Sequence, residues 1–131
     1  MTGTTGNPPA TAPEVIEVFS RRLEAGDLEG ALALFEQGAT FAPQPGQQVS
    51  GLDAIRRALE QFIALKPTMT GTIEKVLEAD GVALVANRWT LRGTRPDGAP
   101  VELAGVSSDV MRRQADGTWR ILVDDPWGAM A

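Results

Sequence analysis

Three aspartates near the C-terminal end have the residue type and position for acid–base chemistry: Asp109, Asp124 and Asp125. They lie in "SSDVMRRQADGTWRILVDDPWG", residues 107–128, which is predicted to form two strands joined by a tight Asp-Gly turn. Inside an apolar pocket, a carboxyl group has its pKa raised toward neutrality, because desolvation disfavours the charged form. Such a group can act as a general acid or base near pH 7. The alternative is that these acids are solvated charges at a strand end.

Strand alternation separates the two adjacent acids. Asp125 shares its parity with the apolar residues of the stretch 119–123, so it is predicted to face the buried side. It is therefore the first candidate for a carboxylate in a pocket. Asp124 is predicted to face the opposite surface, where an arginine such as Arg120 is available to pair with it.

Asp109 lies in the middle of its predicted strand. It shares a strand face with Ser107 and Met111. Because burying a carboxylate without a partner costs several kcal/mol, we expect Asp109 either to face solvent or to have a partner. All three aspartates are candidate catalytic residues.

The residue types that are missing restrict the chemistry further. The chain has no histidine, tyrosine or cysteine, which excludes Ser-His-Asp triads, imidazole proton shuttles, tyrosine oxyanion donors and thiolate chemistry. Any proton transfer must use Asp, Glu, Lys or Arg. No metal and no cofactor are expected.

Length and charge favour one globular domain. The chain has 131 residues, of which 43% are hydrophobic, and its net charge of −5 argues against binding nucleic acid. No apolar run is long enough to span a bilayer, and the N-terminus has no secretory signal pattern, so a cytoplasmic protein without membrane contact is predicted. The Thr-, Gly- and Pro-rich residues 1–12 are predicted to be a disordered leader before a single domain over 13–131.

The N-terminal half is predicted to be mainly helical. Apolar residues at helical spacing predict helices over 12–27, 28–38 and 50–67, and a short strand over 39–43. After residue 67 the hydrophobic period changes to that of strands. The predicted strands, separated by Asp-Gly turns, are 69–80, 82–94, 101–114 and 118–127. This order indicates an α+β fold, with three helices packed on a curved, mostly antiparallel sheet.

Several other side chains are predicted to line a pocket and bind a ligand. Asn87 and Trp89 share one strand face, and Asn87 needs a hydrogen-bonding partner, for which backbone is favoured. Trp89 is either a pocket wall or part of the core. Trp127 either closes the pocket mouth or contacts a second subunit. The remaining candidates, which read equally well as core, are Phe19, Phe41, Phe62 and Met111.

These features together resemble the nuclear transport factor 2-like superfamily, in its SnoaL-like, ketosteroid-isomerase-like branch. The matching segments are two short helices, "ATF" before a Pro/Gly loop, "SGLDAIRRAL" at the start of the third helix, and "DGTWRI" on the last strand. The resemblance implies a cystatin-like cone whose sheet curls around the long helix and leaves an apolar pocket. It also implies a homodimer formed through the convex face of the sheet.

The resemblance does not bring the known catalytic residues of its members. The isomerase base would lie near Pro43, but no acid occurs between Gly38 and Leu52, and the tyrosine of that mechanism is absent. The epoxide-hydrolase pattern Arg-x-Asp occurs only at 95–97, in a predicted turn. The Asp-His pair of the dehydratases is impossible in a chain without histidine.

The sequence therefore predicts a protein with a pocket for a hydrophobic small molecule. One reading is a cofactor-free, cyclase- or isomerase-like enzyme that uses one pocket Asp as acid and base on an apolar carbonyl substrate. A second is a non-catalytic binder of a hydrophobic ligand. A third is a dimeric interaction module.

Overall fold

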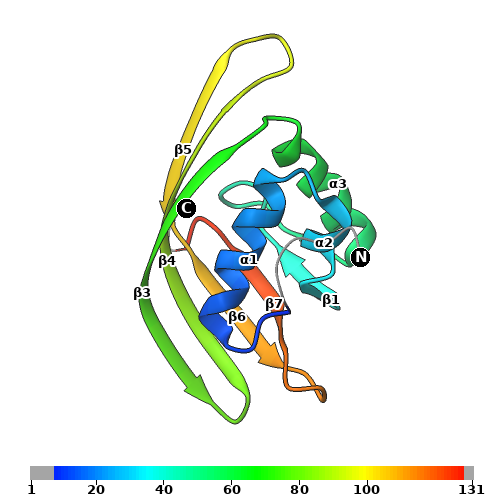
Figure 1. The fold of residues 1–131 in the computed structure, drawn as a ribbon, viewed down its shortest axis with the longest axis vertical. Helices are drawn as coiled ribbons and strands as arrows, with labels where there is room; N and C mark the ends of the chain where they lie inside the picture. Colours follow the sequence, from blue (N-terminus) through cyan, green and yellow to red (C-terminus); the bar gives the residue numbers. More distant parts are fainter. Residues whose placement is uncertain (1–7, 129–131) are drawn as a thin grey trace.

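A computed structural model describes residues 8–128, and in this range three helices pack on the concave face of a curved sheet (Figure 1). The helices are α1 (Ala12–Glu24), α2 (Leu28–Leu32) and α3 (Leu52–Ile63). This arrangement confirms the predicted α+β fold. No described helix combines the length and apolar character needed to cross a membrane.

The sheet has the strand order β2-β1-β7-β6-β4-β3, and β5 pairs with the C-terminal part of β4, from Arg88 to Thr94. Neighbouring strands are antiparallel except for β1 and β7, which are parallel. The strands are β1 (Phe35–Phe41), β2 (Val49–Ser50), β3 (Thr68–Ala79), β4 (Val82–Thr94), β5 (Pro100–Val106), β6 (Ser108–Arg113) and β7 (Trp119–Asp125).

Residues near the end of the predicted leader make hydrogen bonds with the domain. The carbonyl of Pro9 accepts a hydrogen bond from the Trp119 backbone at 3.1 Å, and Thr11 caps α1 by accepting from the Glu14 backbone at 3.4 Å. Residues 9–12 therefore belong to the folded domain. Of the rest of the predicted leader, Pro8 is exposed, and residues 1–7 lie outside the described residues.

The second helix is shorter than its apolar spacing predicts. It ends at Leu32, and Phe35 starts a strand because it pairs with Ile121 of β7. The Leu34 carbonyl accepts from the Ile121 backbone at 2.7 Å. Pairing with the centre of the sheet thus overrides the helical pattern over residues 35–38.

Four phenylalanines link the helices to the sheet beneath them. Phe19 of α1, Phe35 and Phe41 of β1, and Phe62 of α3 form a chain of edge-to-face contacts, with ring centroids 5.6, 6.3 and 6.0 Å apart in that order. Such contacts add stability beyond the apolar area that the rings bury. Through these contacts the two rings of β1 connect α1 to α3.

Candidate functional site

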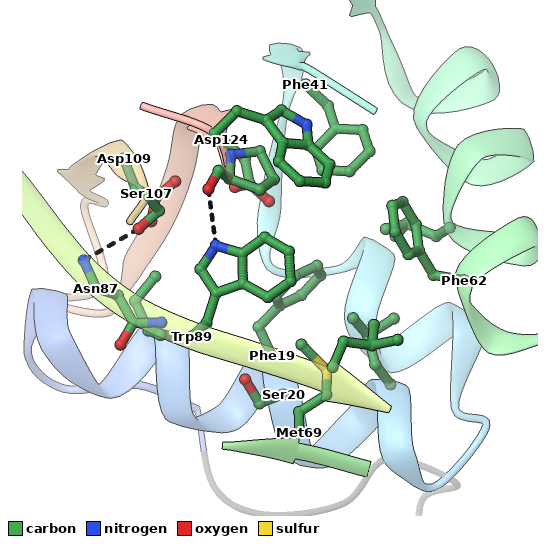
Figure 2. Close-up of a pocket in the computed structure, with 16 residues that line it drawn as sticks. Phe19, Ser20, Phe41, Phe62, Met69, Asn87, Trp89, Ser107, Asp109 and Asp124 are labelled. Carbon is green, nitrogen blue, oxygen red and sulfur yellow. Dashed lines mark hydrogen bonds between the residues drawn. The ribbon is translucent and has the colours of Figure 1, made fainter. Parts of the chain in front are cut away.

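A cavity of about 60 Å³ lies between α1, α3 and the inner face of the sheet (Figure 2). Most of its wall is apolar, with side chains from both helices and from β1, β3 and β4. The polar side chains that line it are Ser20, Asn87, Ser107, Asp109 and Asp124. Except for Ser20, they come from neighbouring strands at one end of the cavity.

Ser107 connects two of these polar residues. It lies at the junction of β5 and β6, opposite Asn87, and its hydroxyl oxygen accepts from the Asn87 backbone N–H at 3.1 Å. The same hydroxyl donates to Oδ2 of Asp109 at 2.7 Å. Because the Asn87 N–H occupies one side of the oxygen, the hydroxyl proton is held toward the carboxylate.

Asp109 and Asp124 form a buried carboxyl pair. They are direct partners across the β6–β7 ladder, and their side chains hydrogen-bond to each other. Asp109 is 2% exposed and Asp124 is 6% exposed. The second oxygen of Asp109, Oδ1, accepts from the Asp125 backbone N–H at 3.2 Å.

The environment separates the acidities of the two carboxyl groups. Burial raises the pKa of Asp109 to about 6, although the hydrogen bonds from Asp124, Ser107 and the Asp125 backbone stabilise its charged form. Burial also raises the pKa of Asp124 well above its ordinary value, and the neighbouring Asp109 charge adds to this effect. Asp109 is therefore the first of the pair to ionise, while Asp124 keeps its proton and donates it to Asp109.

A β-bulge explains why Asp124 lies in the cavity. Ile121 of β7 pairs with Met111 of β6, and Val123 pairs with the adjacent Val110, which leaves Leu122 as an extra residue. The alternation of inward and outward side chains therefore shifts by one position along β7.

The bulge overturns the predicted orientation of the two adjacent acids. Asp124 faces inward and contacts Asp109, so the prediction that it faces the outer surface beside Arg120 is wrong. Asp125 is half-buried and does not line the cavity. Its Oδ1 accepts from the Trp127 backbone N–H at 3.2 Å, which stabilises the turn after β7.

Two tryptophans form one wall of the cavity. The rings of Trp89 and Trp127 meet edge to face with centroids 5.3 Å apart. Nε1 of Trp89 donates to the Pro126 carbonyl at 2.7 Å, and Nε1 of Trp127 donates to the Ala42 carbonyl at 3.0 Å. Gly105 leaves room for the first bond, because a Cβ there would lie 3.0 Å from the Pro126 oxygen.

Most of the predicted lining residues do line the cavity. Met111 does not: it is fully buried in the core, and its place in the predicted site is wrong. The residues that sequence reasoning missed include two serines. Ser107 was detectable, because it shares a strand face with Asp109, whereas nothing distinguishes Ser20 from other polar residues of its helix. The predicted residues found in the lining are Phe19, Phe41, Phe62, Asn87, Trp89, Trp127, Asp109 and Asp124.

The side-chain oxygen of Asn87 lacks the partner that the sequence predicted. The backbone N–H of this residue is bonded to Ser107. Within residues 8–128, however, the buried Oδ1 has no hydrogen-bonding partner, backbone or other. A buried acceptor of this kind is uncommon in folded proteins.

An open groove of about 540 Å³ lies next to the cavity, between α3 and β5. Phe62 and Trp127 line both spaces, so their rings separate the cavity from the groove. The other groove residues include Leu65, which follows α3, and Leu103 of β5. Arg95, in the turn that carries the Arg-x-Asp pattern, lines this groove and is exposed, as the sequence predicts for the turn.

Comparison with known proteins places this arrangement in a structural context. Residues 15–121 match the SnoaL-like domain family. No curated protein matches the chain. A candidate scytalone dehydratase from Novosphingobium aromaticivorans is 18% identical with a TM-score of 0.75, covering 86% of this chain and 77% of that chain. A ketosteroid isomerase-like protein from Erwinia carotovora is 17% identical with a TM-score of 0.75, over 88% and 91%.

A third similar structure is a candidate calcium/calmodulin-dependent protein kinase II association domain from Xanthomonas campestris. It is 18% identical with a TM-score of 0.72, and the match covers 95% of this chain and 94% of that chain. At these identities the similarities establish a shared fold and no shared activity.

Proposed function

The chain belongs to the SnoaL-like domain family, and from that premise we propose that it is a cofactor-free acid–base enzyme acting on an apolar carbonyl compound. Proteins of this fold include isomerases, cyclases and dehydratases. The observation that carries the proposal is the Asp109–Asp124 pair, which faces an otherwise apolar cavity. Two carboxyl groups with separated acidities are the arrangement that proton-transfer enzymes use near neutral pH.

The pair supports a proton transfer next to a carbonyl group. Ionised Asp109 takes a proton from the carbon beside the carbonyl, and the electrons of the broken C–H bond move into the carbonyl to form an enolate. Protonated Asp124 is the acid of the pair: it donates a hydrogen bond, or its proton, to the enolate oxygen. Return of the proton to another carbon of the conjugated system restores the pair and gives the isomerised product. In a cyclisation the enolate carbon instead forms a bond to a second carbonyl carbon of the substrate, and the alkoxide formed there takes the proton back from Asp109, which restores the pair.

The size of the cavity limits how a substrate enters. A volume of about 60 Å³ is smaller than the roughly 150 Å³ cavity that holds a benzene ring. A ring therefore fits only when part of the wall moves. Phe62 and Trp127 are the side chains whose movement would join the cavity to the adjacent groove.

Exchange of carbon-bound protons tests the proposal whatever product the enzyme forms. The protein is incubated in D₂O at neutral pD with cyclohexanone and 2-decalone, and loss of the α-proton signals is followed by NMR. We expect exchange faster than in buffer, and a decrease of about 100-fold or more in Asp109→Asn, because the general base is removed. Asp80→Asn is the matched control: Asp80 is exposed in a turn with a positive φ of 50°, which asparagine tolerates.

The same assay separates the enzyme from the non-catalytic binder. Exchange that is equally slow in the wild-type protein, in Asp109→Asn and in buffer, while ketone shifts on the protein show binding, would establish the binder instead. Equal loss of exchange in Asp80→Asn would indicate a general effect of removing negative charge.

We also propose that the chain forms a homodimer through the convex face of the sheet. Leu77, Leu84, Val110 and Val123 are successive partners across β3, β4, β6 and β7, and they form an apolar row on the outer face. Leu77 is 59% exposed and Leu84 is 39% exposed. A continuous apolar row on a sheet face is a feature that a second copy of the chain can cover.

A further inference from the structure

We propose that the side-chain oxygen of Asn87 is the acceptor for a hydroxyl or N–H group of the bound molecule. The ligand class is then an apolar compound that carries a hydrogen-bond donor in addition to the carbonyl group expected at the carboxyl pair. The carbonyl half of this description rests on the proposed function. The inference that the ligand carries a hydrogen-bond donor rests on Asn87 alone and is tested by measuring binding.

The first observation is the combination of burial and missing partner. Asn87 is 6% exposed and lines the cavity (Figure 2). Its Oδ1 has no partner within the described part of the chain. An amide oxygen in that position has lost its bonds to solvent, so a donor supplied by the ligand gains more there than at an exposed site.

The second observation is that the sheet makes room for this amide. Gly71 of β3 lies beside it, and a Cβ on Gly71 would be 3.0 Å from Oδ1 and 3.2 Å from Nδ2 of Asn87. Gly71 pairs with Trp89, and Asn87 pairs with Ile73, so both positions belong to the same inner face. A Cβ at position 71 would therefore require the amide to shift by a few tenths of an ångström.

The third observation concerns the polar groups on the other side of Asn87. Ser107 already donates to Asp109 and accepts from the Asn87 backbone, so its hydrogen bonds are directed within the protein. Ionised Asp109 and protonated Asp124 bond to each other. Among the polar side chains that line the cavity within residues 8–128, the Asn87 oxygen is the fully buried atom for which the protein supplies no hydrogen bond.

Phenol and toluene test this assignment as a matched pair. They fill nearly the same space, so the effect of opening the cavity cancels in the ratio of their dissociation constants, and only phenol has a donor. Both constants are measured by NMR titration of the wild-type protein and of Asn87→Leu. We expect the Leu variant to raise the ratio of the phenol dissociation constant to the toluene dissociation constant by about tenfold, because only phenol loses a hydrogen bond. An unchanged ratio overturns the proposal.

Two further variants make the test specific. Ser20→Ala removes the other hydroxyl that lines the cavity away from the carboxyl pair, and the wild-type ratio should persist in it. A tenfold shift in Ser20→Ala instead would make the Ser20 hydroxyl oxygen the acceptor of the ligand's donor and overturn the role of Asn87. Gly71→Ala keeps Asn87 but shifts its amide. It should change the ratio of dissociation constants in the same direction as Asn87→Leu. This variant keeps the test valid if Asn87→Leu does not fold.

The outcome is independent of catalysis. A preference for phenol that depends on Asn87, found together with no α-proton exchange, would support Asn87 as the acceptor for a ligand donor and would contradict the proposed enzymatic function. Failure of both compounds to bind the wild-type protein would overturn the donor site.

Discussion

Asp109 and Asp124 face each other directly across two antiparallel strands, with both carboxyl groups inside the protein. Like charges at directly opposed positions of a sheet normally destabilise the pairing. Here one proton between the two groups removes the repulsion, and the Ser107 hydroxyl and the Asp125 backbone N–H stabilise the remaining negative charge on Asp109. The pair is thus a single titrating unit rather than two independent acids.

The rate of proton abstraction should depend on the ionisation of Asp109. Because burial raises the pKa of Asp109 to about 6, we expect the α-proton exchange rate to increase with pH up to about 6 and then to level off. The measurement is the exchange rate of 2-decalone between pH 4 and pH 8. A rate that stays constant over this range contradicts the assignment of Asp109 as the base.

The stability of the protein should decrease as pH rises above about 4. Raised pKa values in the folded state mean that the unfolded chain loses these protons first, so stability is fully present below the ordinary aspartate pKa near 4. It is then lost up to the folded value of about 6 for Asp109, and to a higher pH for Asp124. We expect Asp124→Asn to flatten this dependence and to raise the free energy of unfolding at pH 7 by about 1 kcal/mol.

Thermal melts between pH 3 and pH 8 measure this difference. Glu29 and Glu36 act in the opposite direction, because their hydrogen bonds to arginines lower the pKa of each carboxyl, and the stability that they add is lost as pH falls through those lowered values. Their contribution is the same in the wild-type protein and in Asp124→Asn and cancels in the comparison. Parallel curves for the two proteins would contradict the prediction.

Trp127 should control entry of ring-shaped ligands. Trp127→Phe removes the bond to the Ala42 carbonyl and reduces the ring that separates the cavity from the groove. We expect a loss of about 1 kcal/mol in stability and faster association of phenol, measured by NMR exchange. Trp89→Phe is the matched control: it loses a similar bond to Pro126 but does not line the groove, so association should be unchanged. Equal rates in all three proteins would argue for another entrance.

A charge on the convex face should dissociate the proposed dimer. Leu84→Lys places an ammonium group in the middle of the outer apolar row, and a charge that must be buried in the interface disfavours association strongly. We expect the wild-type protein to sediment as a dimer and Leu84→Lys as a monomer. Gln37→Lys adds the same charge to an exposed position of β1, toward the other edge of the sheet, and should remain dimeric. A monomeric wild-type protein would remove the dimer proposal.

Periodicity was sufficient for the α+β class, but not for every element boundary or for the orientation of the acids. The α+β order, the antiparallel sheet and the inward face of Asn87 and Trp89 follow from hydrophobic spacing and Asp-Gly turns. The inward orientation of Asp124 in place of Asp125 could not be predicted in this way. It depends on Leu122, the extra residue of β7, and the apolar run "ILV" does not show which of its residues is unpaired. The early start of β1 was missed for a related reason: its partner β7 is distant in the sequence.

The bulge at Leu122 has a consequence for aligning this chain with its relatives. A relative with a regular final strand has one residue fewer between the positions that match Ile121 and Asp124. An alignment that matches Ile121 and has no gap would then equate Val123, which lies on the outer face, with the relative's inward residue that corresponds to Asp124. A single gap opposite Leu122 corrects the correspondence, so functional residues can be transferred across this strand only after its hydrogen-bonded register has been compared.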